Sequence, residues 1–152
     1  MVKNYTSLVD VSKSVQHIES RLVKQGAKNI FKHYNDKKKL EGIAFIIAVD
    51  GKDVPYRMPA KVDQVERILR TAITRPRPET MKRVADQAER TAWKLVSDWV
   101  EINLSLIELG QAEFMEVFLP YVYDHGKNQT FFESMKQDGF KLLENQSQGV
   151  AQ

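Results

Sequence analysis

Three histidines, His17, His33 and His125, are the side chains best suited to proton transfer near neutral pH. His17 lies among charged residues on the flank of an expected helix, which is typical of a solvated position. His125 lies between Asp124 and Gly126, in a sequence typical of a turn. The chain contains no HExxH, GxSxG, Walker A or GxGxxG motif. We therefore expect that the protein is not an enzyme and that it needs no cofactor.

A metal centre is also disfavoured. The carboxylates Asp36, Glu41, Asp50 and Asp53 lie close together in the sequence, and a metal nuclease needs such groups to converge. However, Asp36 and Asp50 fall in expected turns, where aspartate is favoured by its local backbone hydrogen bonds. The absence of Cys excludes disulfides and thiolate zinc sites and fits a reducing compartment. We expect no metal and a cytoplasmic location.

Basic residues are concentrated in the first hundred positions. Residues 1–60 contain 11 Lys and Arg against 6 Asp and Glu, residues 61–100 contain 9 against 6, and residues 101–152 contain 3 against 8. The net charge of +3 therefore combines a basic front with an acidic back. A basic surface of this kind favours a polyanion partner, because phosphate contacts release counterions. The same lysines and arginines are also common as solubility devices and as partners in helical i, i+4 ion pairs.

The sheet that positions this surface is predicted by two hairpins. Residues 30–35 and 40–49 have strand composition, with a charged connection between them, and the pair Asp50-Gly51 is typical of a two-residue type I′ turn before a third strand that ends near Met58. This turn places Phe45 opposite Tyr56 on the core face and Arg57 opposite Ala44 on the other face.

The second face of the sheet is the candidate platform for bases. If the first loop has four residues, Phe31 lies beside Ala44 and His33 beside Gly42, so that rings rise from a low floor next to Arg57. Single strands need flat rings on which bases stack. A shift of one residue would present Ile30, Lys32 and Tyr34 instead. The predicted nucleic-acid contacts are Phe31, His33, Lys37, Lys38, Lys39, Arg57, Arg70, Arg75, Arg77, Lys82 and Arg83.

Apolar periodicity predicts helices over residues 11–25, 61–73 and 79–109, with a rigid proline-containing elbow at 74–78. Two short helices are expected near 114–119 and 130–135. The fold class is therefore α+β, a small antiparallel three-stranded sheet packed on helices, with one long helix in the second half. Residues 1–143 form a single domain in this interpretation, and residues 144–152 form a flexible polar tail.

A protein-binding function is the alternative. Many of the aromatic residues fall between residues 93 and 132, and aromatic enrichment is typical of interface centres, although core packing is the favoured explanation for any single one of them. A second apolar stripe on the long helix would be covered on two sides or contact another subunit. This hypothesis predicts a homo-oligomer through the long helix or a host protein as partner. No apolar run is long enough for a membrane span, so no membrane partner is expected.

Several segments carry a family resemblance: Val54–Ala60 (VPYRMPA), Gln87–Trp93 (QAERTAW) running on to Asp98–Val100, and Phe118–Tyr121 (FLPY). Over most of residues 11–140 the chain resembles a family of small proteins found in phages and integrated mobile elements. This resemblance implies an origin and assigns no activity or site residue. In element order alone, the three strands followed by a helix are similar to Rad52-like and phage single-strand annealing proteins.

Together these features predict a non-enzymatic nucleic-acid-binding accessory protein of a phage or mobile element, with single strands as the preferred ligand. The alternative is a phage-encoded protein-binding factor, for example an inhibitor of a host defence system, that acts through an aromatic or acidic surface.

Overall fold

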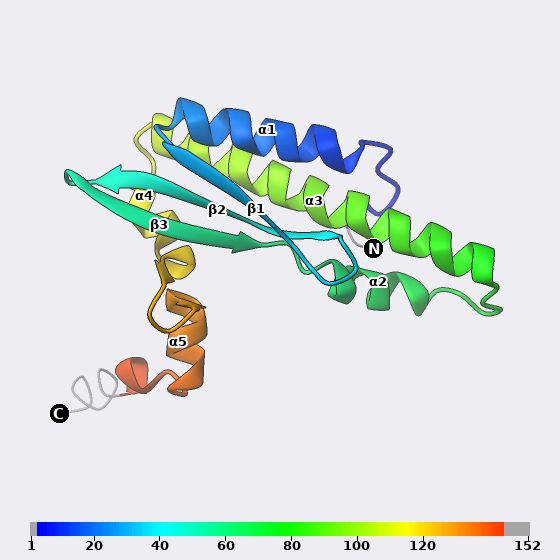
Figure 1. Cartoon of the computed structure of the whole chain (residues 1–152). Coiled ribbons are helices and arrows are strands. Elements are labelled where there is room, and N and C mark those ends of the chain that lie inside the picture. Colours follow the sequence, from blue (N-terminus) through cyan, green and yellow to red (C-terminus); the bar gives the residue numbers. More distant parts are fainter. Residues whose placement is uncertain (1–2, 145–152) are drawn as a thin grey trace.

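A computed structural model describes residues 3–144, and Figure 1 shows how their helices and strands are arranged. The elements in chain order are α1 (Val11–Lys24), β1 (Asn29–Tyr34), β2 (Leu40–Val49), β3 (Lys52–Pro59), α2 (Val62–Arg70), α3 (Pro78–Glu108), α4 (Phe114–Phe118), the 3-10 helix η1 (Leu119–Tyr121), β4 (Tyr123–Asp124), β5 (Gln129–Thr130) and α5 (Phe131–Gln137). The predicted α+β class is confirmed, with the antiparallel sheet β1-β2-β3 packed on helices. From residue 145 onward the expected tail lies outside the described residues.

The β2–β3 hairpin has the predicted register. Phe45 lies opposite Tyr56, and Ala44 lies opposite Arg57 on the other face. Asp50 and Gly51 both have positive φ, 51° and 78°, as a type I′ turn requires. The turn type therefore decided which side chains of this hairpin face the core.

The first hairpin has the predicted register but a different loop. Its loop comprises residues 35–39, one residue more than expected, and β1 already ends at Tyr34. A register shift between His33 and Tyr34 absorbs the extra residue. Phe31 therefore still lies beside Ala44, and the sheet faces are not exchanged.

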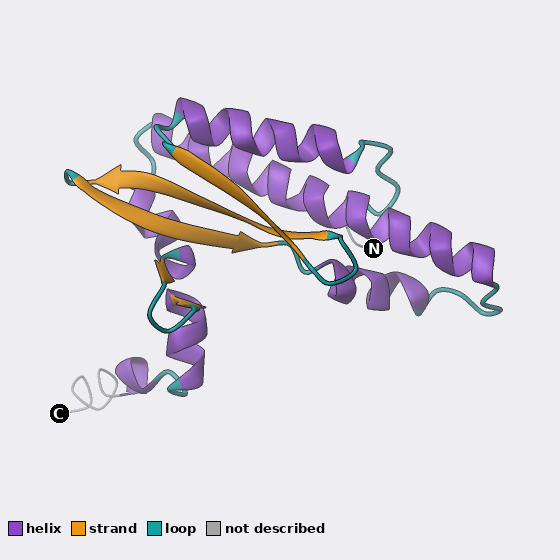
Figure 2. Ribbon diagram, viewed as in Figure 1, coloured by secondary structure: helices purple, strands orange, loops and turns teal. Residues whose placement is uncertain are grey.

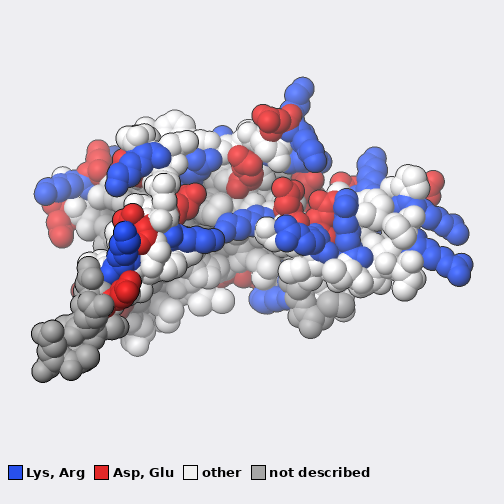
Figure 3. Space-filling view, turned by 90° about the horizontal axis from the view of Figure 1, so that it is seen from below, with Lys and Arg blue, Asp and Glu red and all other residues white. Residues whose placement is uncertain are grey.

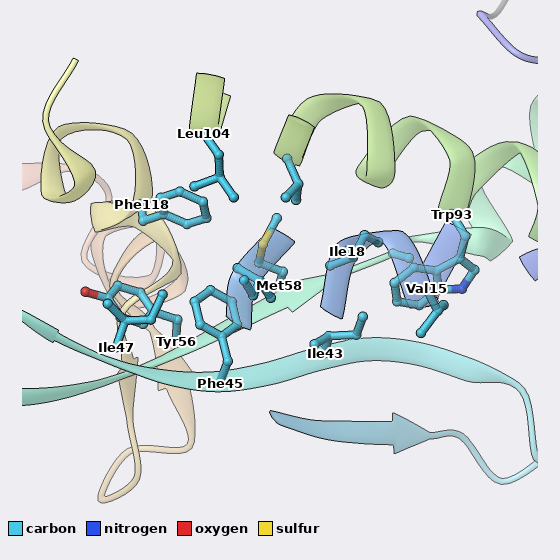
Figure 4. Close-up of a cluster of buried hydrophobic side chains, with 13 residues drawn as sticks. Val15, Ile18, Ile43, Phe45, Ile47, Tyr56, Met58, Trp93, Leu104 and Phe118 are labelled. Carbon is cyan, nitrogen blue, oxygen red and sulfur yellow. The ribbon is translucent and has the colours of Figure 1, made fainter. Parts of the chain in front are cut away.

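The core lies between the inner face of the sheet and the helices α1 and α3, which Figure 2 shows running alongside the strands. In Figure 4, Val15 of α1 and Trp93 and Leu104 of α3 reach the same layer as Phe45 of β2. The Phe45 and Tyr56 rings stack with centroids 5.1 Å apart. Burial of such large apolar side chains, each worth about 1.5–3 kcal/mol, fixes the sheet against the two helices.

Helix α3 is the longest element, with 31 residues, and starts with Pro78 in its first turn, where proline is tolerated. The second apolar stripe predicted for it is covered within the chain, because Val100 and Leu104 are fully buried. By contrast, Ile102 and Leu106 are exposed. The preceding helix, α2, ends at Arg70, three residues before the predicted end, and residues 71–77 connect it to α3 without helical structure. No helix within residues 3–144 has both the length and the apolarity that crossing a bilayer requires.

The segment after α3 forms a C-terminal module, residues 114–137, that packs on β3 and α3. An antiparallel bridge joins Val122 to Tyr56 on β3, and the N–H of Phe131 donates to the carbonyl of Val122 at 2.7 Å. The Trp99 ring of α3 lies 5.4 Å from the Phe118 ring. Most of the aromatic residues that the alternative hypothesis assigns to a binding surface pack in or against the core, as the favoured explanation expected. The small hairpin β4–β5 was not predicted.

Candidate nucleic-acid interface

The outer face of the sheet is formed by Phe31, His33, Gly42, Ala44 and Arg57. Phe31, Ala44 and Arg57 lie in one row across the three strands, and neighbouring strands are about 4.8 Å apart. Phe31 is 54% exposed, although a Phe in this position gains nothing from contact with water. The structure therefore contains the predicted arrangement, in which the exposed Phe31 ring and the Arg57 cation lie on either side of the small residue Ala44.

The floor of this face has to be small. A Cβ atom built on Gly42 would lie 3.1 Å from the backbone oxygen of Met58, which is closer than such contacts normally are. Ala44 is the next residue of the same strand on this face. Because these two positions carry almost no side chain, a planar group laid between Phe31 and Arg57 would meet the backbone of β2 and the methyl group of Ala44.

Two further aromatic residues, Tyr123 and His125, belong to this neighbourhood and were missed by sequence reasoning. The guanidinium carbon of Arg57 lies 5.6 Å from the centroid of the Tyr123 ring, a cation–π arrangement. The His125 ring lies 4.9 Å from the Tyr123 ring and perpendicular to it, and the Tyr123 hydroxyl is hydrogen-bonded to the side chain of Asn128. The sequence identified only a turn at His125, because no local signal places this turn against β3.

The three lysines at the tip of the first hairpin do not share one role. Asn35 organises the loop, since its side-chain oxygen accepts hydrogen bonds from the N–H groups of Lys37 and Lys39. The ammonium of Lys39 lies 2.9 Å from Glu89 of α3, and this hydrogen-bonded pair raises the pKa of the lysine. Lys37 and Lys38 are exposed and make no ion pair among the described residues. Lys39 thus holds the hairpin to α3, and Lys37 and Lys38 remain available for phosphates.

The cations around the elbow form a separate group. In the structure the elbow comprises residues 71–77; Arg75 and Arg77 belong to it, Arg70 ends α2, and Lys82 and Arg83 lie in the first turns of α3. Arg70 is paired with Glu66 at 2.6 Å. Arg75, Arg77, Lys82 and Arg83 are exposed and have no ion-pair partner within residues 3–144. Figure 3 shows basic side chains gathered at the end of the molecule where α2 and α3 meet, whereas acidic and basic groups are interspersed along the rest of that face.

The elbow is far from the sheet platform. The Trp93 indole donates to the carbonyl of Leu40 at the beginning of β2. Arg77 precedes Trp93 by sixteen positions, which corresponds to about 24 Å along α3. The predicted site residues are therefore divided among the outer face, the hairpin tip and the elbow. They do not form one continuous patch.

The histidines and carboxylates are the groups that proton transfer or metal binding would use. Within the described part of the chain, no three His, Asp or Glu side chains lie close enough to hold a metal ion. His17 contacts Glu101 at 3.1 Å, but both groups are exposed and belong to an ion-pair network with Arg21 between α1 and α3. An open groove of about 590 Å³ between α1 and the first hairpin is lined by Glu19, Lys32, Tyr34, Lys39 and Glu89 among others. Its two acids are each neutralised by one of its lysines.

Comparisons with known proteins give no relative on which to base a function. No protein-family model, no curated protein and no solved structure matches this chain. The resemblance to phage and mobile-element proteins, and the likeness to annealing proteins in element order, therefore stay predictions.

Proposed function

We propose that this protein binds single-stranded nucleic acid without catalysing a reaction, as an accessory protein of a phage or mobile element. The observation that carries the proposal is the row Phe31–Ala44–Arg57, in which an exposed ring and a cation flank a flat floor. Unpaired bases stack on such rings, and each stack is worth about 1–3 kcal/mol by alanine substitution. A duplex hides the faces of its bases, so this surface favours single strands.

The cations supply the second part of the proposal. Lys37 and Lys38 lie at the end of the same sheet and can hold phosphates of a strand that crosses the platform. Along α3, Lys82 and Arg83 lie about 15–17 Å and Arg77 about 24 Å from Trp93, so a longer strand is needed to reach these cations. Affinity should therefore rise with oligonucleotide length in two stages: a short strand of about 6 nucleotides uses the sheet, and a strand of about 20 nucleotides also uses the elbow.

The test is fluorescence anisotropy with labelled oligo-dT over a salt series. Each phosphate contact with a single strand contributes about 0.7 to the slope of log K against log salt. The variant Lys37→Gln/Lys38→Asn should therefore bind more weakly and lose about 1.4 from that slope. Asparagine is chosen for position 38 because the residue there has φ 62°, which asparagine tolerates.

The matched control is Lys13→Gln/Lys24→Gln, which removes the same charge from exposed positions of α1. It should leave the slope almost unchanged. Binding by the wild type that is insensitive to salt would contradict the proposal, and so would equal slopes for the two double variants.

A protein-binding function is the second candidate, and the exposed apolar side chains Ile102, Leu106 and Leu109 at the end of α3 favour it. Exposed apolar patches often mark interaction sites. In its homo-oligomeric form, this candidate predicts a dimer in sedimentation velocity that Ile102→Lys dissociates. A protein that stays monomeric at all concentrations would contradict the homo-oligomeric form of this candidate.

A further inference from the structure

We infer that the C-terminal module completes the binding platform, so that the outer face accommodates a run of two or three unpaired bases between Phe31 at one side and the Arg57–Tyr123 pair at the other. This inference rests on the proposed function and specifies its ligand and its boundary. It assigns a binding role to Tyr123 and a supporting role to residues 114–137.

The first step is the register of the module. Val122 bridges Tyr56 in antiparallel fashion, and Tyr56 faces the core. The next residue, Tyr123, therefore lies opposite Pro55, whose neighbour Ile46 belongs to the outer face. Side chains alternate between faces along a strand, so the Tyr123 ring is placed on the same side of the sheet as Phe31.

The second step is the span. The segment at Tyr123 lies beside β3 as a fourth strand would, so three strand spacings separate it from β1, or about 14 Å. Four-stranded sheets that bind RNA stack two or three bases over a comparable width. Between the two ends, the outer face carries Ala44 in the row of Phe31 and the apolar residues Ile46 and Pro55 in the row of Tyr123.

The third step is the state of Arg57. A free arginine side chain loses rotamer freedom when it binds a ligand, and that loss weakens binding. Here the guanidinium already lies over the Tyr123 ring at 5.6 Å, and the Tyr123 hydroxyl is hydrogen-bonded to Asn128. The guanidinium plane is therefore held in place, where a base can stack on it and its N–H groups can reach a phosphate. Tyr123 positions Arg57 and extends the apolar platform.

The experiment measures the affinity of the full chain for oligo-dT and for the matching duplex. The variant Tyr123→Leu keeps an apolar side chain but removes the ring, and we expect it to lower the affinity for the single strand about fivefold or more. Tyr123→Phe loses the hydrogen bond to Asn128 but keeps the ring and its contact with Arg57, so it should retain most of the affinity. Comparing the two variants separates a loss of stacking from a loss of folding. Circular dichroism melts of both variants would reveal a loss of folding.

The matched control is Tyr5→Leu, the same exchange at an exposed tyrosine of the N-terminal segment. A second readout places the bases: 2-aminopurine substituted at successive positions of the oligonucleotide should change its fluorescence at two or three adjacent positions only. Phe31→Ala and Tyr123→Leu should each restore the free signal at one end of that run.

The possible failures are distinguishable. If the wild type binds no oligonucleotide, the proposed function fails and this inference fails with it. If the wild type binds oligo-dT with a steep salt dependence but Tyr123→Leu binds equally well, only the inference is overturned. Equal affinity for single strand and duplex would also overturn the inference, because it would show that phosphates alone are recognised.

Discussion

The hydroxyl of Tyr56 should make this protein less stable than it would be with phenylalanine at the same position. Tyr56 is 0% exposed, and its hydroxyl oxygen has no hydrogen-bond partner among the described residues. The ring itself is well packed: it stacks on Phe45 at 5.1 Å and meets the edges or faces of Phe114 and Phe118. Tyr56→Phe therefore removes an unsatisfied polar group and keeps the ring contacts.

The magnitude follows from the desolvation of that hydroxyl. A buried polar group without a partner costs about 1–3 kcal/mol, and removing it leaves a void of one oxygen atom, which offsets part of the gain. We expect Tyr56→Phe to raise the free energy of unfolding by about 1 kcal/mol. For a chain of this size, that corresponds to about 2–4 °C in Tm.

The pH dependence gives the prediction a second signature. Burial raises the pKa of Tyr56 above its ordinary value. A raised pKa in the folded state means that the stability is fully present below the unfolded pKa of about 10 and is lost as pH rises above it. The advantage of Tyr56→Phe over the wild type should therefore grow when unfolding is measured at increasing alkaline pH.

The assay is urea unfolding followed by tryptophan fluorescence, with the slope m compared to ensure that both proteins unfold in the same way. The matched exchange is Tyr121→Phe, at a half-buried tyrosine whose pKa burial also raises. A loss of more than about 1 kcal/mol in Tyr56→Phe would refute the reasoning, since it would mean that the hydroxyl is satisfied in solution.

Two further predictions concern α3. Burial opposes ionisation of Asp98, but hydrogen bonds from Asn4 and Lys94 and the charge of Lys3 outweigh it and lower the pKa of the carboxyl. The stability that this lowered pKa provides is present above the unfolded pKa of about 3.9 and is lost as pH falls through the lower folded pKa. The free energy of unfolding of Asp98→Asn, measured from neutral to acid pH, should therefore decline less steeply than that of the wild type. Leu104 is 0% exposed and Leu109 is 74% exposed. Urea unfolding should show a loss of about 2–5 kcal/mol for Leu104→Ala and less than about 0.5 kcal/mol for Leu109→Ala, and similar losses would contradict the packing of α3 on the core.

The sheet could be predicted because its signals are local. Asp50-Gly51 requires positive φ at two adjacent positions, and that requirement alone set the pairing of Phe45 with Tyr56 and of Ala44 with Arg57. The first hairpin was predicted with the wrong loop length but the right register, because the shift at His33 restores the alternation that burial demands.

The candidate site was predicted only in part, because the sequence position of a charged residue does not show where its side chain lies in the folded protein. Lys37, Lys38 and Lys39 are adjacent, yet Lys39 is drawn to Glu89, fifty residues away. Similarly, nothing around Tyr123 indicates that its segment pairs with β3, since a single bridge at Val122 has no sequence signature. Contacts made by one or two residues across a long separation depend on the whole fold.

The bridge between Val122 and Tyr56 also bears on how the chain is made. The ribosome synthesises residues 114–137 after the three strands of the sheet, so the backbone groups of β3 that Val122 later pairs with have no covering segment while the sheet first assembles. An edge strand with unpaired backbone groups can pair with a strand of a neighbouring nascent chain. On the opposite margin, β1 carries the charged side chain of Lys32, which is present from the start and discourages such pairing. Part of the β3 edge is therefore covered by a segment that is synthesised later than the sheet, and until then this edge is open to pairing with another copy of the chain.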